Sequence, residues 1–178
     1  MTVLRCTAKL LKAMKARPVA NPAPAQNRLG EWTANLIRIG RIQLVLAVNE
    51  RTRLGLVIDA APYAMISERF TQQVFKSLLW LGIEGDHAAA EAEATRPTQI
   101  AASNSRSVLA TLNQFAWRAE VDIHYGKANS AAELSHRLAD EIVCKPKHIG
   151  MPADRVREAF GLAPIDRRVR VPSDVILH

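Results

Sequence analysis

Short apolar runs bounded by turn residues dominate the first sixty positions of the chain. Residues 34–39 and 42–48 form two such runs on either side of the pair Gly40-Arg41, a pattern that predicts a β-hairpin. A further run at residues 54–58 predicts a strand that follows the hairpin. We therefore expect three antiparallel strands in this part of the chain.

A strand and a helix are predicted before the hairpin. Residues 3–7 predict a short strand, and Thr7 is a suitable N-cap for a helix whose apolar residues recur at helical spacing up to Pro18. The segment 18–27 contains three prolines and predicts a polar loop, because proline cannot donate the backbone hydrogen bonds of a regular element.

The spacing of apolar residues becomes helical after Pro62. A first helix is predicted to end at Gly82, and a short one is predicted at residues 88–94. The pair Asn104-Ser105 predicts the N-cap of a long helix, and residues 130–143 predict another amphipathic helix.

Strands followed by helices predict the α+β class. We expect a small antiparallel sheet in the N-terminal half, packed against helices of the C-terminal half. Residues 1–160 are expected to form a single domain, and residues 161–178, rich in arginine and proline, are expected to form a basic C-terminal tail. The pattern shows no internal repeat.

Composition agrees with a folded chain that has one core. Of 178 residues, 48% are hydrophobic and 23% are charged, whereas disordered chains contain fewer apolar residues. A domain of this length buries about two thirds of the surface of its unfolded chain. It therefore needs neither disulfides nor a structural metal ion.

Basic residues are concentrated in the N-terminal part of the chain. The net charge is +7, and residues 1–58 contain ten Lys or Arg against Glu31 and Glu50. Such a surface attracts nucleic acid or an acidic protein, or it serves solubility. We expect it to steer the protein toward a partner, with little direct binding to nucleic acid at physiological salt.

Cysteine usage indicates the reducing cytoplasm. Cys6 and Cys144 are too few for a disulfide framework and are not spaced like zinc ligands or a redox motif. No apolar run reaches the length of a signal peptide core or a membrane span. We expect a protein that is neither exported nor inserted into a membrane.

Candidate catalytic and metal-binding residues are scattered. His87 with Glu91, or His136 with Asp140, offers two ligands where zinc needs three or four, so we expect no metal site and no cofactor. Cys6 is expected to be a buried thiol at the end of a strand.

An RNase remains the enzymatic alternative, with Glu50 as base, Arg106 as phosphate clamp and His124 as acid. Because this trio rests on residue types and forms no linear motif, the sequence favours a protein that is not an enzyme.

The second strand of the predicted hairpin contains a candidate docking motif. Its segment Gln-Leu-Val-Leu-Ala-Val resembles the peptide by which bacterial polymerases and repair proteins dock on the β sliding clamp. In such a peptide the glutamine amide enters a polar subsite and the apolar side chains fill a groove. Here valine stands in the last position, where phenylalanine is preferred. The candidate clamp-binding residues are Gln43, Leu44, Leu46, Ala47 and Val48.

A structural role for the same segment is the alternative. In a strand, Leu44, Leu46 and Val48 share one face and are expected to point into the core, with Gln43 on the opposite face. A buried motif cannot dock. Clamp binding therefore requires either that this strand lies at a sheet edge or that the hairpin opens locally.

Several stretches of the chain resemble a bacterial family. Residues 4–11, 29–36, 40–50 and 104–109 are similar to small bacterial proteins whose general role is uncharacterised, and within them to the SocB type of toxin. The likeness covers about the first 120 residues.

The resemblance implies a replication-blocking toxin of a toxin-antitoxin pair that binds the β sliding clamp. It also implies a SocA-like antitoxin that acts as a proteolytic adaptor and delivers the toxin to the ClpXP protease. An antitoxin-controlled binding module with another target remains open, as does the RNase.

Overall fold

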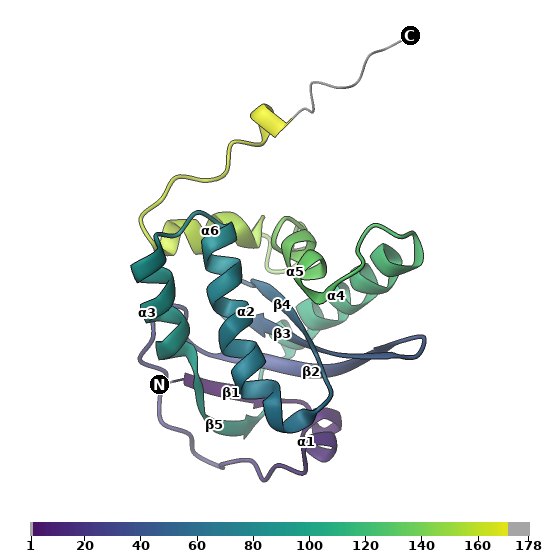
Figure 1. Cartoon of the computed structure of the whole chain (residues 1–178). Helices are drawn as coiled ribbons and strands as arrows, with labels where there is room; N and C mark the ends of the chain where they lie inside the picture. The colour runs from purple at the N-terminus through teal and green to yellow at the C-terminus, as the bar shows by residue number, and fades with distance from the viewer. Residues whose placement is uncertain (1, 171–178) are drawn as a thin grey trace.

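The computed structural model describes residues 2–170 and is built around one five-stranded sheet (Figure 1). The strands lie in the order β4-β3-β2-β1-β5 across the sheet. Their bounds are β1 (Thr2–Cys6), β2 (Trp32–Ile39), β3 (Ile42–Asn49), β4 (Gly55–Asp59) and β5 (Pro97–Ala102).

The sheet is mixed. β2, β3 and β4 are antiparallel neighbours, as the hairpin pattern predicts, whereas β1 runs parallel to both β2 and β5. The α+β class is confirmed, but the expectation of a purely antiparallel sheet is wrong for β1. The reason is that a helix and a loop connect β1 to β2, and such a crossover returns the chain in the same direction.

Six α-helices and two short 3-10 helices complete the described part of the chain. No helix within it has the length and apolar character needed to cross a membrane. The helices are α1 (Ala8–Met14), η1 (Tyr63–Met65), α2 (Ile66–Trp80), α3 (Gly85–Thr95), α4 (Arg106–His124), α5 (Ala131–Ala139), α6 (Pro152–Ala159) and η2 (Arg167–Arg170).

Helices bury both faces of the sheet. One hydrophobic cluster joins the sheet to α1, α2, α3 and α6, and a second joins it mainly to α4 and α5. In β3, Val45 and Ala47 belong to the first cluster, while Leu44, Leu46 and Val48 belong to the second. The two faces of β3 therefore contribute to two different cores, as the alternation of side chains along a strand requires.

Close packing at the start of β4 explains why residue 55 is a glycine. A Cβ built on Gly55 would lie 2.7 Å from Cδ2 of Phe115 in α4. Only a residue without a side chain lets the α4 ring approach the strand so closely.

Both edges of the sheet are covered. At the β4 edge, Ser135 of α5 accepts a hydrogen bond from the Val57 N–H (2.8 Å), and its single hydroxyl proton lies between the Ala131 carbonyl (2.9 Å) and the Val57 carbonyl (3.4 Å). At the β5 edge, the loop predicted from its prolines lies alongside, and the Val19 N–H donates to the Ile100 carbonyl (2.8 Å). These contacts satisfy backbone groups that an exposed edge would offer to another chain.

The predicted tail is partly fixed to the helices. Leu162 and Ile165 pack against the first hydrophobic cluster, and Arg167 forms ion pairs with Asp154 (2.8 Å) and Asp140 (3.0 Å). The tail was expected over residues 161–178, of which residues 171–178 lie outside the described part of the chain. Its first residues extend the packed domain.

Candidate functional site

The candidate clamp-binding motif occupies most of β3, and its apolar anchors are buried. Gln43 is exposed, whereas Leu44, Leu46 and Val48 lie in the second cluster beneath α4 and Ala47 lies in the first. β3 is paired on both sides, with β2 and with β4. The hypothesis that the motif lies at an edge of the sheet is therefore wrong.

The motif reaches the surface at its first residue, Gln43, at the turn end of the β2–β3 hairpin. Ile42 is 48% exposed and Gln43 follows it, while the buried Leu44 forms part of the wall of a surface groove. The groove has a volume of about 320 Å³. It is lined by Ile42, Leu44, Asp59, Ile123, Ala128, Asn129, Ser130, Ala131 and Leu134.

Four elements, β3, β4, α4 and α5, and the loop before α5 build this groove. The hairpin supplies one wall, the end of α4 supplies Ile123, and the first turn of α5 supplies the floor through Ala131 and Leu134. Ser130 caps α5 by accepting a hydrogen bond from the Glu133 N–H (3.1 Å), which fixes the turn that closes the groove. The lining is largely apolar with a few polar groups, the composition typical of binding sites.

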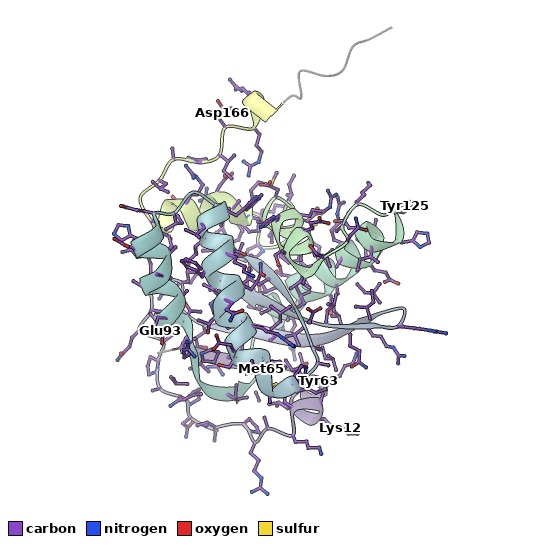
Figure 2. All side chains as sticks on the ribbon, viewed as in Figure 1. Lys12, Tyr63, Met65, Glu93, Tyr125 and Asp166 are labelled. Carbon is purple, nitrogen blue, oxygen red and sulfur yellow. The ribbon has the colours of Figure 1, made fainter. Side chains whose placement is uncertain are left out.

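Gln43 does not line the groove, because its side chain lies on the opposite face of β3, where it is held in place. The Tyr63 hydroxyl donates to Oε1 of Gln43 (3.0 Å), and the Ala60 N–H donates to the Gln43 carbonyl (3.3 Å). Figure 2 shows Tyr63 next to the start of α2 and Tyr125 at the end of α4. The amide nitrogen of Gln43 thus stays available for a partner while its oxygen is engaged.

The candidate RNase residues are not brought together. Arg106 is the first residue of α4 and His124 is the last, so their backbones are about 27 Å apart at 1.5 Å per helical residue. Glu50 lies in the turn after β3, near Arg53. A base, a clamp and an acid at these places cannot contact the same phosphate group.

The two candidate metal pairs are engaged in structural contacts. Glu91 is buried and accepts hydrogen bonds from the N–H groups of Leu29 (2.8 Å) and Arg28 (3.1 Å). His136 stacks on Trp80 with 4.3 Å between the ring centroids, and burial lowers the pKa of His136. Within residues 2–170, no three His, Cys, Asp or Glu side chains gather in a way that could hold a metal ion.

Cys6 is a buried residue at the end of β1, as expected. Burial raises the pKa of its thiol to about 12, so the thiolate that a nucleophile requires is not formed near neutral pH.

Sequence reasoning did not identify the groove. Ala128, Ala131 and Leu134 read as ordinary helix or loop residues, and nothing in their spacing indicates that they face Ile42, nearly ninety residues earlier. The exposed isoleucine directly after the predicted turn is the one local signal that pointed to this surface.

The comparisons give a family for the chain. Residues 3–155 match the family model of a domain of unknown function, DUF6933. The match begins in β1 and ends within α6, so it includes the whole sheet and the groove. No curated protein and no solved structure matches this chain.

Proposed function

We propose that this chain, which belongs to the family of the domain of unknown function DUF6933, is a non-enzymatic binding protein that docks on the bacterial β sliding clamp and blocks DNA replication. The observation that supports the proposal is the apolar groove lined by the exposed Ile42, at the same end of β3 as the exposed Gln43. The resemblance of the Gln43 segment to clamp-binding peptides supplies the identity of the partner.

Docking through the folded surface is favoured over opening of β3. Exposing Leu46 and Val48 breaks two strand ladders and separates both hydrophobic clusters, so its cost approaches the whole free energy of unfolding, about 5 to 15 kcal/mol. A micromolar contact supplies only about 8 kcal/mol. The hairpin end therefore carries the docking in this proposal.

The hairpin end offers a partner both apolar and polar contacts. Ile42 presents a side chain that a partner can bury, and the groove accepts an apolar side chain in return. The amide of Gln43 offers a directional hydrogen bond on the opposite face of the same hairpin end, next to Tyr63. Exposed Arg38 and Arg41 in the same hairpin add positive charge, which speeds encounter with an acidic surface.

The proposed biology is that of a cytoplasmic toxin. An antitoxin of the SocA type would bind the protein and deliver it to ClpXP, so that replication stalls only when the antitoxin is absent. This part of the proposal rests on the resemblance of residues 4–11, 29–36, 40–50 and 104–109 to SocB-type toxins.

Paired isoleucine substitutions test the docking surface. Ile42→Asp removes the apolar contact at the hairpin and should weaken binding to purified β clamp by about tenfold to a hundredfold, since a buried isoleucine contributes about 1.5 to 3 kcal/mol. Ile142→Asp is the matched control, because Ile142 is 60% exposed and does not line the groove. Equal affinity of both variants for the clamp, measured by calorimetry, would refute the proposed site.

A further inference from the structure

Arg53 is a buried arginine in the turn between β3 and β4. It is 6% exposed, and its backbone has a left-handed φ of 60°. Asn49 fixes this turn, because its side-chain oxygen accepts hydrogen bonds from the N–H and the hydroxyl of Thr52, both at 2.9 Å. These bonds fix the backbone of the turn from which the Arg53 side chain extends.

The guanidinium of Arg53 lies at the first turn of α4. Its Nη2 donates to the hydroxyl of Ser107 (2.9 Å), while its Nε and Nη1 are buried without a hydrogen-bond partner. Among residues 2–170, no carboxylate forms an ion pair with Arg53. A buried cation without a counter-charge is costly.

The first turn of α4 adds positive potential at the same place. Ser105 caps the helix by accepting a hydrogen bond from the Val108 N–H (3.3 Å), which leaves the N–H groups of Arg106 and Ser107 without an intrahelical acceptor. The dipole of this 19-residue helix is positive at that end. The exposed side chain of Arg106 contributes a further charge.

Because the side chain of Arg53 lies at the N-terminus of α4, we infer that this place is an anion site that binds a phosphate group. A phosphate oxygen at this end of the helix accepts from the N–H groups of Arg106 and Ser107 and takes the charge of Arg53 as its counter-ion. The site lies by the end of β3 that is opposite to the hairpin groove, so it is independent of clamp docking.

A phosphomonoester or free phosphate suits the site better than a nucleic-acid backbone. The candidate donors, which are the first N–H groups of α4 and the side chain of Arg53, lie at a single helix end, whereas a nucleic-acid backbone is followed by an extended groove with repeated contacts. A monoester also carries nearly two charges at neutral pH, which best offsets an unpaired guanidinium and a helix dipole.

Glu50 is the group that competes with the anion. Its charge attracts Arg53 from the same turn, although the two side chains form no ion pair within the described residues. If Glu50 were the counter-ion of Arg53, removing it would destabilise the fold. In our inference, Glu50→Gln instead strengthens phosphate binding, because it removes a repelling charge beside the site.

Titration of the full chain with sodium phosphate, followed by NMR, tests the inference, with sodium chloride at equal ionic strength as reference. The amide signals of Arg106 and Ser107 should shift with phosphate and remain unchanged with chloride. Arg53→Gln should weaken binding by about tenfold or more, since it removes a charged donor. Arg38→Gln is the matched control, because Arg38 is an exposed arginine whose Nε bonds a nearby carbonyl.

A second variant and two further ligands complete the test of the phosphate site. Should Arg53→Gln fail to fold, Ser107→Ala carries the test, because Ser107 is exposed and its hydroxyl positions Nη2 of Arg53. A mononucleotide should cause the same shifts, and an unphosphorylated DNA duplex should not. Absence of shifts with phosphate, unchanged affinity in both variants, or shifts with the duplex alone would overturn the inference.

Discussion

Asp122 shows how much a single residue contributes to this fold. Its carboxylate is fully buried in α4 and accepts hydrogen bonds from Arg137 of α5 (2.7 and 3.1 Å) and from Arg118 (3.3 Å). Burial raises the pKa of Asp122, but the hydrogen bonds and charges of the two arginines lower it further, so the pKa lies below its ordinary value. The ion pairs thus fasten α5 to α4.

We predict a loss of stability in acid that depends on Asp122. Because its pKa is lower in the folded state, the ion pair stabilises the protein above pH about 4 and is lost as the pH falls through the folded pKa. Asp122→Asn should lower the free energy of unfolding by about 1 to 3 kcal/mol at pH 7 and flatten its decline below pH 4. Urea denaturation at pH 7 and below pH 4 measures the free energy of unfolding of both proteins.

Glu120→Gln serves as the control for that experiment, because Glu120 is an exposed acid on the same helix. Its unfolding free energy should match that of the parent protein at both pH values. An Asp122→Asn protein as stable as the parent at pH 7 would contradict the role assigned to the ion pair.

Single residues were predictable where their partners are near in sequence. Thr7 and Ser105 were predicted as N-caps, and both accept a backbone N–H three residues ahead. Asp122 pairs with Arg137 across fifteen residues, and Arg53 reaches Ser107 across fifty-four. Such pairs depend on how the elements pack, which local patterns do not specify.

At the scale of elements, the β4 edge depends on one hydroxyl. The Ser135 hydroxyl accepts from the Val57 N–H (2.8 Å) and lies 3.4 Å from the Val57 carbonyl, so a side chain of α5 covers these two groups on the outer side of the strand. These two backbone groups point away from β3, because alternate residues of an antiparallel strand direct their hydrogen bonds to opposite sides.

We predict that Ser135→Ala loosens this edge. The Val57 N–H would remain buried without a partner, which costs about 1 to 3 kcal/mol. Amide hydrogen exchange of Val57 should become faster, while that of Ile58, whose N–H faces β3, should change only through the lower overall stability. Unchanged exchange at Val57 would mean that Ser135 does not protect the edge.

Elements with clear periodicity were predicted, and those without it were missed. The hairpin of β2 and β3 and the helix α4 follow strong patterns of apolar residues. β5 was missed because it begins with proline and includes threonine and glutamine, a composition that edge strands tolerate. α6 was missed because its eight residues contain few apolar positions.

At the scale of the whole molecule, the position of β3 inside the sheet determines which residues of the candidate motif a partner can reach. Alternation along β3 predicts one buried face, but the helices bury both faces, since α2 covers one side and α4 the other. The accessible part of the candidate motif is thereby confined to its first residue, Gln43, which follows the exposed Ile42. The unbroken apolar run from Leu44 to Val48 is the local pattern typical of a strand covered on both faces.

At this scale, the net charge of the protein also predicts how it binds DNA. The charge of +7 should give weak binding to duplex DNA that is lost between low salt and about 150 mM salt, because exposed charges are screened over about 8 Å there. Fluorescence anisotropy with two unrelated duplexes measures it. A tight, salt-resistant complex would contradict a binding protein whose charge only steers encounter.

Amide hydrogen exchange of the protein bound to the β clamp tests the central claim most directly, because it distinguishes docking through the folded hairpin from opening of β3. The proposal predicts that Ile42, Gln43 and the first turn of α5 gain protection in the complex, while the amides of Leu46 to Val48 stay as protected as in the free protein. Faster exchange across Leu46 to Val48 in the complex would show that the strand leaves the sheet to bind, and would contradict docking through the folded surface.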